Sequence, residues 1–168
     1  MYSEQKQALA SELNFKHPAV LAVSGAKGCG KTTLLAALLP VLKARGLKVG
    51  VIRQAELDAA DPDTARLHNA GAAGVAVFSA GHYLLTEEFR LNEQDLLALF
   101  ERHSYDLVLL EGFNDSGWPK IEVIRKAAGT GSVAFQPLAV AGDVPGADFP
   151  LDDPAPLADW IENQMPTL

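Results

Sequence analysis

Residues 25–33 combine glycines, lysines and two threonines in a spacing that suits polyphosphate binding. The segment reads Gly-Ala-Lys-Gly-Cys-Gly-Lys-Thr-Thr. It fits the phosphate-binding loop (Walker A) pattern, which is a glycine, four residues of any type and then Gly-Lys-Thr. In such a loop, backbone N–H groups and the N-terminus of the following helix surround the phosphates of a nucleotide. The segment therefore predicts a nucleotide site that binds mainly through the backbone.

Three side chains of this loop have predicted roles of their own. The ammonium of Lys31 lies against the β- and γ-phosphates and serves catalysis, the hydroxyl of Thr32 coordinates Mg²⁺, and Thr33 reaches an α-phosphate oxygen. Lys27 has two open interpretations, a second cation at the nucleotide or a solvated lysine at the tip of the loop. The other loop residues contribute through a backbone that bends and approaches the phosphates closely: Gly25, Ala26, Gly28, Cys29 and Gly30.

Two alternative interpretations of the loop are weaker. One is an ordinary glycine-rich turn between a strand and a helix. However, the chain has 14 glycines in 168 residues, and the full pattern arises by chance in only roughly 1% of such sequences. The other is a dinucleotide fingerprint, which needs a third glycine where Thr33 stands. Phosphate binding is therefore the preferred interpretation.

The sequence around the loop predicts the elements that position it. An apolar run at 19–24 predicts a strand before the loop. Residues 31–45 predict a helix after it, kinked or deprived of one backbone hydrogen bond at Pro40 and ended by Gly46. Residues 3–14 fit either a short helix or a frayed terminus. Further strands are expected at 47–53, 74–78, 82–86, 106–112, 121–125 and 138–141, and further helices end at Ala70 and cover 93–103 and 157–164.

Strands that alternate with helices predict a doubly wound α/β fold, with a mostly parallel sheet flanked by helices, as in P-loop NTPases. No internal repeat or linker divides the sequence, so we expect one domain of residues 1–168. Within it, residues 1–16 form a leading segment, and residues 143–168 form an acidic, proline-rich tail that ends in a helix.

Glu111 is the predicted second half of the site. The run from Asp106 to Gly112 reads Asp-Leu-Val-Leu-Leu-Glu-Gly, which is typical of a buried central strand of a parallel sheet. Ligands bind at the carboxyl ends of such strands. Glu111, at that end, is therefore the catalytic candidate that binds Mg²⁺ together with Thr32 or orients the attacking water, whereas Asp106 caps the start of the strand.

Other groups at strand ends are weaker candidates. The N–H of Gly112 is expected to contact the γ-phosphate, and the carboxylate of Asp143 is expected to meet the nucleotide base. Three acids in the connector after the second strand are candidate outer ligands of the metal: Asp58, Asp61 and Asp63. Each of the three fits an ordinary solvated acidic loop as well. The four histidines have no metal-binding spacing.

Composition excludes several function classes. The net charge is −7 with a pI near 5.0, and no basic stripe is visible, so nucleic acid is not an expected partner. No apolar stretch approaches the roughly 20 residues that cross a bilayer, and the first residues lack the features of a signal peptide. Neither a membrane nor export is therefore expected. A single cysteine fits a reducing cytoplasm.

Several segments together resemble one known family. The loop continues as Gly-Cys-Gly-Lys-Thr-Thr-Leu-Leu at 28–35, and residues 42–49 read Leu-Lys-Ala-Arg-Gly-Leu-Lys-Val. Further along come Ala-Gly-Ala at 70–72, Asp-Leu-Val-Leu-Leu-Glu-Gly-Phe at 106–113 and Pro-Lys-Ile-Glu-Val at 119–123. Over residues 19–125 this pattern resembles the molybdopterin-guanine dinucleotide biosynthesis protein B (MobB) family, with a weaker similarity in the C-terminal tail. The segments around Glu111 and Lys120 are the more particular ones, since many NTPases share the loop.

The resemblance implies a small homodimeric protein that binds GTP with Mg²⁺, hydrolyses it weakly and assists nucleotide attachment in molybdenum cofactor maturation. The implied partners are the guanylyltransferase of that pathway and molybdoenzyme chaperones. There is one departure from the family, because residues 54–57 read Gln-Ala-Glu-Leu where the family has a His-Thr-His-His segment. Any contact of that segment with metal, cofactor or γ-phosphate is in question in this chain.

Three other functions use the same loop. A small-molecule or nucleotide kinase needs an acceptor pocket and an arginine-bearing lid. Arg125 and Lys126 are the weak candidates for such a lid, and the sequence has no arginine-dense segment. A GTPase that assembles nickel centres needs a histidine or cysteine metal site. A non-hydrolysing adaptor needs only nucleotide binding, and nothing in the sequence excludes it. No arginine finger or water-positioning glutamine follows Gly112, so unaided hydrolysis is expected to be slow.

Overall fold

A computed structural model describes residues 17–55, 61–87, 90–129 and 131–168. The chain forms two compact units, one of residues 1–54 and 93–168 and one of residues 55–92. The leading helix expected at 3–14 lies outside the described residues, as does Asp58. Among the described helices, none is both long enough and apolar enough to cross a bilayer.

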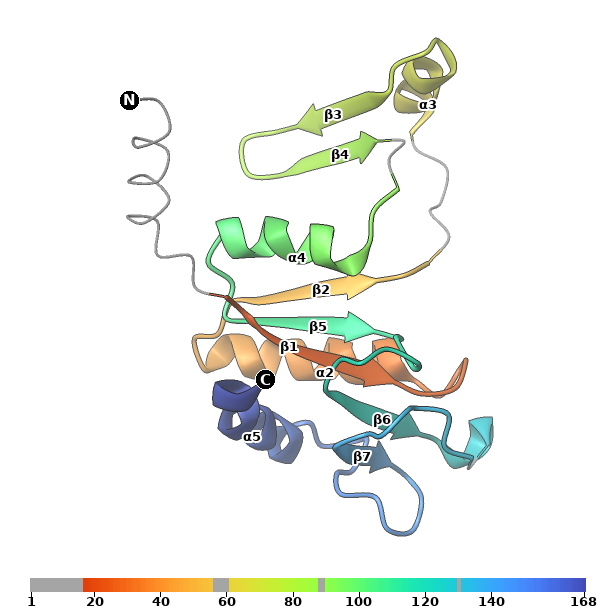
Figure 1. Ribbon diagram of the computed structural model, residues 1–168, viewed down its shortest axis with the longest axis vertical. Coiled ribbons are helices and arrows are strands. Elements are labelled where there is room, and N and C mark those ends of the chain that lie inside the picture. Colours follow the sequence, from red (N-terminus) through yellow and green to blue (C-terminus); the bar gives the residue numbers. More distant parts are fainter. Residues whose placement is uncertain (1–16, 56–60, 88–89, 130) are drawn as a thin grey trace. The chain divides into compact units, whose positions relative to one another are not determined.

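The first unit is built on a five-stranded sheet in which every neighbouring pair of strands is parallel (Figure 1). Its strands follow the order β2-β5-β1-β6-β7, so that β5, β1 and β6 are the interior strands. Apolar runs form these strands because a central parallel strand is covered on both faces. The strands are β1 (Ala19–Ser24), β2 (Val49–Arg53), β5 (Leu107–Glu111), β6 (Lys120–Ile124) and β7 (Ala139–Gly142).

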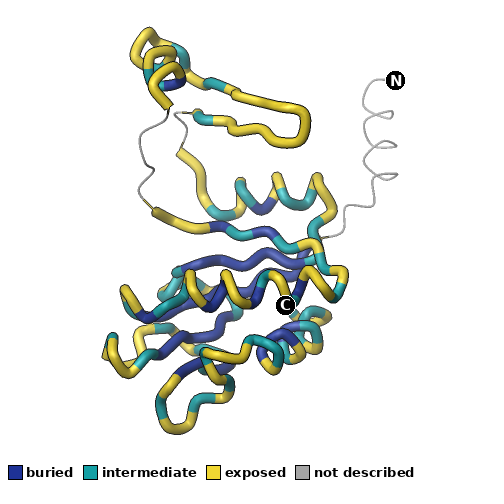
Figure 2. Tube along the Cα trace, turned by 180° about the vertical axis from the view of Figure 1, so that it is seen from behind, coloured by how far each residue is buried: buried dark blue, intermediate teal, exposed yellow. Residues whose placement is uncertain are grey.

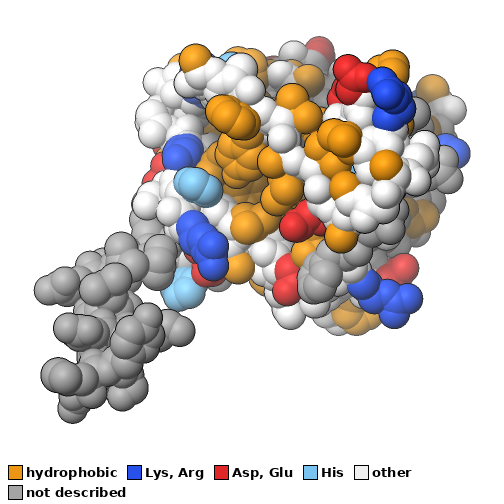
Figure 3. All heavy atoms as spheres, turned by 90° about the horizontal axis from the view of Figure 1, so that it is seen from above, with side chains coloured by type: hydrophobic (Ala, Val, Ile, Leu, Met, Phe, Trp, Pro, Cys, Tyr) orange, Lys and Arg blue, Asp and Glu red, His pale blue; other side chains and the backbone are white. Residues whose placement is uncertain are grey.

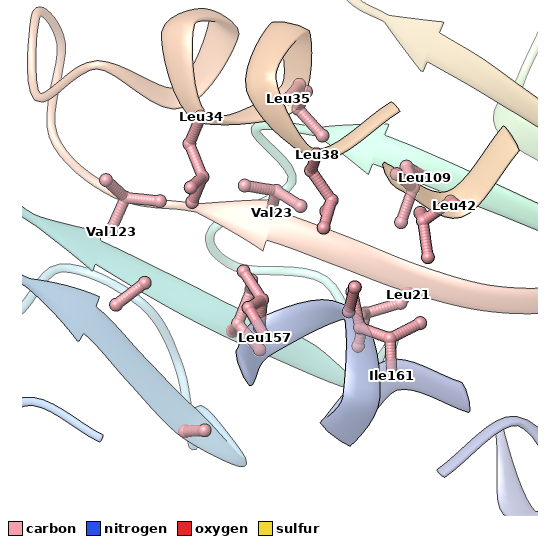
Figure 4. Packing of buried hydrophobic residues seen from close by; sticks show 14 of the residues in the cluster. Leu21, Val23, Leu34, Leu35, Leu38, Leu42, Leu109, Val123, Leu157 and Ile161 are labelled. Carbon is pink, nitrogen blue, oxygen red and sulfur yellow. The ribbon is translucent and has the colours of Figure 1, made fainter. Parts of the chain in front are cut away.

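Helices cover both faces of this sheet. Side chains alternate along β1, so Leu21 and Val23 join a core with helices α2 (Lys31–Ala44) and α5 (Ala155–Gln164). Val20 and Ala22 point to the other face, where they pack with Leu97 of helix α4 (Glu93–Arg102). Figure 4 shows the first core, with the leucines of α2 directed toward β1, and Figure 2 shows the buried central strands. The prediction of a doubly wound α/β fold is confirmed.

Pro40 lies inside α2, which runs without interruption from Lys31 to Ala44. Proline removes one backbone donor. Its ring lies on the exposed face of the helix, so the helix continues past it. The stop at Gly46 is confirmed, because this residue has φ of 83° and its N–H bonds to the carbonyl of Lys43.

The C-terminal helix α5 is part of the core of the first unit. Leu157, Ala158 and Ile161 are fully buried against the sheet. Arg45, at the C-terminal end of α2, forms an ion pair of 2.6 Å with Asp159 and a second one with Glu162, both in α5. The acidic tail therefore contributes to folding through both its apolar and its charged residues.

The second unit contains helix α3 (Pro62–Asn69) and strands β3 (Gly74–Phe78) and β4 (Tyr83–Glu87). The strands at these positions were expected, but they form a separate two-stranded antiparallel sheet rather than part of the parallel one. The short connection between β3 and β4, residues 79–82, explains the difference, because two parallel neighbouring strands need a crossover of roughly a dozen residues or more. His68 joins α3 to this hairpin by bonding the carbonyl of Ala72 at 2.9 Å and the hydroxyl of Thr86 at 2.8 Å.

Candidate phosphate-binding site

The glycine-rich loop lies where the sequence predicted, between the carboxyl end of β1 and the start of α2. Strand β1 pairs with β5 on one side and with β6 on the other. The ends of these three parallel strands therefore surround the loop with residues that are far apart in the sequence. Glu111, Asn114 and Arg125 all contact the loop or the first turn of α2.

Two glycines of the loop are required by their surroundings. Gly25 has φ of 139°, and a Cβ there would lie 2.4 Å from the carbonyl oxygen of Val123. Gly30 has φ of 96°, and a Cβ there would lie 3.1 Å from Nη2 of Arg125. Other residues would be strained at both positions, because left-handed backbone angles favour glycine. The loop therefore holds a shape that only this residue pattern supports.

The start of α2 is prepared for an anion. Its N-cap is Gly30, which has no side chain to accept hydrogen bonds from the N–H groups of the first turn. No acidic residue stands in that turn. Helix N-termini carry partial positive charge and normally attract a capping oxygen. The ammonium of Lys31 meanwhile donates to the carbonyls of Gly25 at 2.9 Å and Ala26 at 2.7 Å. The donors of a phosphate site are thus assembled within one turn of chain.

The remaining loop side chains differ in their surroundings. Lys27 and Thr33 are exposed, and Lys27 lies at the tip of the loop. Cys29 is 1% exposed, and its Sγ lies beneath the loop, 3.9 Å from the Lys31 ammonium. The thiol therefore faces inward, in keeping with the prediction that Cys29 contributes through its backbone.

Glu111 meets Thr32 at the start of α2. It is 9% exposed at the carboxyl end of β5, and the Thr32 hydroxyl donates to its Oε1 at 2.5 Å. Its other oxygen, Oε2, lies 3.4 Å from Nε of Arg53 at the end of β2. Both predicted metal ligands are thus brought together, and an arginine that the sequence did not indicate joins them.

This oxygen pair fits Mg²⁺. A hydroxyl and a carboxylate are hard ligands, and protein sites for Mg²⁺ typically use one or two such groups together with phosphates and water. Within the described ranges, no group of three His, Cys, Asp or Glu side chains could hold a metal by itself. The nickel-centre alternative, which needs such a group, gains no support from the described part of the chain.

The loop that follows β5 is fastened to the phosphate loop. Oδ1 of Asn114 accepts a 3.0 Å hydrogen bond from the N–H of Gly25, and the hydroxyl of Ser24 donates to the carbonyl of Gly112 at 2.6 Å. The N–H of Gly112 donates to the carbonyl of Val23 at 2.9 Å. In this structure that N–H bonds within the sheet, so the predicted contact with a γ-phosphate would require this bond to break.

Two buried charges of β6 hold neighbouring loops. The ammonium of Lys120, which is 1% exposed, donates to the carbonyls of Phe113, Asn114 and Ser116 at 3.2, 3.0 and 2.5 Å. Burial lowers the pKa of Lys120, and the charge of Asp115 opposes that shift. The strand was expected at 121–125, but it begins one residue earlier, with Lys120.

Glu122, also 1% exposed, holds the segment before β7. Its Oε1 accepts from the N–H groups of Val133 at 2.6 Å and Ala134 at 2.9 Å, and its Oε2 accepts from the hydroxyl of Ser132 at 2.5 Å. Buried charges are tolerated when they are fully hydrogen-bonded. The Lys-Ile-Glu segment therefore acts as scaffold on both sides of the site.

The other acidic candidates have structural partners. Asp106 stands at the start of β5, away from the loop, and its Oδ2 accepts from the N–H of Lys48 at 2.8 Å. Asp61 caps α3 by accepting from the N–H and hydroxyl of Thr64. Asp63 pairs with Arg66 in the same helix at 3.5 Å. These contacts account for Asp61 and Asp63 as surface residues of the second unit.

Two residues at the site gave no signal in the sequence analysis. They are Arg53 and Asn114, and a third, Arg125, was named only as a weak lid candidate. Arg125 follows β6 and donates from Nε to the carbonyl of Cys29 at 3.2 Å. The rule that ligands gather at carboxyl strand ends would have drawn attention to Arg53 and Arg125, because both stand at such ends.

Comparisons with known proteins agree with this architecture. The profile of the family described as "MobB: Molybdopterin guanine dinucleotide synthesis protein B" matches residues 20–143, which includes the loop, Glu111 and β7. The chain belongs to the MobB family. The resemblance noted in the sequence is thereby confirmed.

Named relatives match most of this chain. The molybdopterin-guanine dinucleotide biosynthesis adapter protein of Escherichia coli (strain K12) is 35% identical over 162 residues, covering 87% of this chain and 93% of that protein. The protein of the same name from Haemophilus influenzae is 36% identical over 113 residues, or 64% of each chain. The solved structure of Bacillus subtilis MobB has a TM-score of 0.68 at 25% identity, and the match covers 87% of this chain and 97% of that one.

Proposed function

We propose that this MobB family member is a GTP-binding accessory protein in the biosynthesis of the molybdopterin guanine dinucleotide form of the molybdenum cofactor. The observation that carries the proposal is the contact of Thr32 with Glu111 beside an uncapped helix N-terminus. The family membership and the names of the relatives supply the pathway. A single free cysteine, Cys29, fits a cytoplasmic location.

Each residue of the loop has a defined task in this proposal. The backbone N–H groups at the start of α2 bind the phosphates, and the Lys31 ammonium leaves the carbonyls of Gly25 and Ala26 to bind the β- and γ-phosphates. Thr32 and Glu111 hold Mg²⁺, which neutralises charge on the phosphates when it is bound. The Glu111 carboxylate also orients a water molecule toward the γ-phosphate.

We expect the hydrolysis to be slow. Glu111 is held on one oxygen by Thr32 and on the other by Arg53, so its freedom to activate water is limited. In P-loop GTPases an arginine supplied to the γ-phosphate accelerates hydrolysis by roughly 10³–10⁵. Among the described arginines, Arg53 is the one that contacts Glu111, and its contact is with the carboxylate. A slow GTPase suits a switch or delivery step.

Base recognition falls to the other side of the loop. Asp143 stands directly after β7, and its Oδ1 accepts from the N–H of Lys126 at 2.6 Å. This bond fixes an exposed carboxylate at the ligand-binding end of the sheet. A carboxylate accepts hydrogen bonds from both N1–H and N2–H₂ of guanine, which adenine lacks. We therefore assign the preference for GTP to Asp143.

We also propose a homodimer, formed through the hairpin of the second unit. Five of its side chains are exposed and apolar, with Phe78 at 82% and Tyr83 at 71%. The other three are Val77, Leu84 and Leu85. Figure 3 draws the hydrophobic side chains of the surface in orange. Exposed apolar hairpins are unusual in monomers. A Phe78→Glu protein that sediments as a monomer while the unaltered protein sediments as a dimer supports this interface, and equal masses refute it.

The proposed partners are the guanylyltransferase of the pathway or a molybdoenzyme chaperone. The kinase alternative needs an acceptor pocket beside the loop. An open groove of about 780 Å³ is present in the first unit, and its lining includes Leu39, Lys43, Lys48 and Tyr105. Leu39 and Lys43 belong to the later turns of α2, Lys48 precedes β2 and Tyr105 precedes β5, so the groove lies at the opposite end of α2 from Lys31. This groove does not serve phosphoryl transfer from the loop.

Calorimetry with GTP, ATP and a molybdopterin dinucleotide, each with Mg²⁺, tests the function. We expect GTP to bind in preference to ATP, and Asp143→Asn to reduce that preference while leaving the affinity for inorganic tripolyphosphate unchanged. Slow release of phosphate from GTP supports the switch. Transfer of phosphate from ATP to a small acceptor would overturn the proposal in favour of a kinase.

A further inference from the structure

Arg125 is a half-buried cation next to the phosphate loop, and its hydrogen bond is with that loop. Its Nε donates to the carbonyl of Cys29 at 3.2 Å, and its Nη2 would lie 3.1 Å from a Cβ on Gly30. Within the described ranges, no carboxylate forms an ion pair with it. In a chain of net charge −7, a partly buried arginine is usually paired with an acid.

Arg125 adjoins the phosphate loop from the side of β6. Its Nε bonds the carbonyl of Cys29, and its guanidinium lies next to Gly30 at the start of α2. Lys31 and the N–H groups at the start of α2 are the proposed phosphate donors. Arg125 therefore borders the phosphate cradle on its β6 side.

The strand order indicates which part of a nucleotide it faces. Strand β1 lies between β5 and β6. Thr32 and Glu111 mark the β5 side, so the metal and the terminal phosphates lie there. The nucleoside then leaves the cradle on the β6 side, where Arg125 stands. Ile124 and Gly142, the residues before Arg125 and Asp143, pair in register, so both side groups extend from adjacent strand ends.

We infer that Arg125 is a nucleoside-binding residue whose guanidinium plane packs against the purine ring. The inference rests on the proposed nucleotide binding and adds a contact to it. Arginine stacks well on aromatic faces because its charge is delocalised over a plane. The bond from Nε to the loop fixes that plane before the ligand arrives, which reduces the entropy lost on binding. Any purine offers such a face, so this contact strengthens binding without choosing between GTP and ATP.

The test compares a nucleotide with a ligand that has phosphates only. Calorimetry of Arg125→Ala with GTP and with inorganic tripolyphosphate, both with Mg²⁺, should show GTP weakened on the order of tenfold. Tripolyphosphate should bind as it does to the unaltered protein. Lys126→Ala, which removes the adjacent exposed lysine, is the matched control and should change neither affinity.

Arg125→Lys distinguishes stacking from a purely structural effect, because lysine keeps the positive charge but lacks the planar guanidinium. We expect this variant to lose most of the affinity that stacking adds for GTP and ATP, while the melting temperature of the free protein stays unchanged. Equal weakening of GTP and tripolyphosphate would overturn the inference, since it would assign Arg125 to the phosphates or to loop shape. Unchanged GTP binding by Arg125→Ala would overturn it too, while the proposed function would stand. A failure of the unaltered protein to bind GTP would overturn both.

Discussion

The hydroxyl of Thr32 donates a 2.5 Å hydrogen bond to Oε1 of Glu111, across 79 positions of sequence. This contact joins the first turn of α2 to the carboxyl end of β5. It brings the two predicted oxygen ligands of Mg²⁺ to one point.

Glu111→Gln should impair GTP hydrolysis more than GTP binding. The amide keeps the shape and can still accept from the Thr32 hydroxyl, but it has no charge for Mg²⁺ or for activating water. We expect phosphate release to slow by about tenfold to a hundredfold, with a change in GTP affinity of less than about threefold. Single-turnover hydrolysis and calorimetry measure the two effects. Equal losses in both would show that Glu111 has a structural role.

Lys31→Ala should abolish nucleotide binding, because the proposed role of its ammonium is to bind the β- and γ-phosphates. We expect GTP affinity to fall by at least about a hundredfold. Lys27→Ala is the matched control, since it removes the same charge from the exposed tip of the same loop. If both variants bind GTP as the unaltered protein does, the site assignment is wrong. A large loss in Lys27→Ala would instead make that lysine a nucleotide contact.

Lys120→Met should destabilise the protein and loosen the loop after β5. The methionine fills the same buried space but leaves the carbonyls of Phe113, Asn114 and Ser116 without their donor. We expect the free energy of unfolding to fall by about 2 kcal/mol. Urea unfolding measures this loss, and faster hydrogen exchange at residues 112–116 locates it. Lys43→Met, on the exposed surface of α2, should be neutral, and a neutral Lys120→Met would contradict the scaffold role.

Helix α3 should lose stability in acid through Asp61. Hydrogen bonds from Thr64 lower the pKa of Asp61 below its ordinary value of 3.8. The unfolded chain therefore binds this proton at a higher pH than the folded chain does. The stabilisation is complete above pH 3.8 and is lost as the pH falls through the lower folded pKa. Nuclear magnetic resonance of the α3 amides should show this loss, and Asp61→Asn, which caps without titrating, should not show it.

The sequence was sufficient for the parts of the site that lie within one segment or at one strand end. The spacing of glycines and Lys31 predicts a loop between a strand and a helix, because that pattern carries its own local geometry. Glu111 follows from a buried strand and the rule for strand ends. The structure has both features where the sequence analysis expects them.

Pairing between distant segments was beyond the sequence. The strands at 74–78 and 83–87 form their own hairpin, since propensity identifies a strand but not its neighbour. Lys120 and Glu122 look like ordinary surface charges in the sequence, yet they are buried because two segments, 113–116 and 132–134, return to bond them. Arg53 and Asn114 are likewise defined by partners more than fifty positions away. Such contacts depend on the strand order, which periodicity does not encode.

The burial of Cys29 has a practical consequence. It is the sole sulfhydryl of the chain, and it is covered by the very backbone that would embrace a nucleotide. An alkylating or disulfide reagent can reach the thiol only when the loop opens, so the rate of Cys29 modification reports how often the loop opens. Slower modification in the presence of GTP would show that the ligand occupies the loop, without an engineered label.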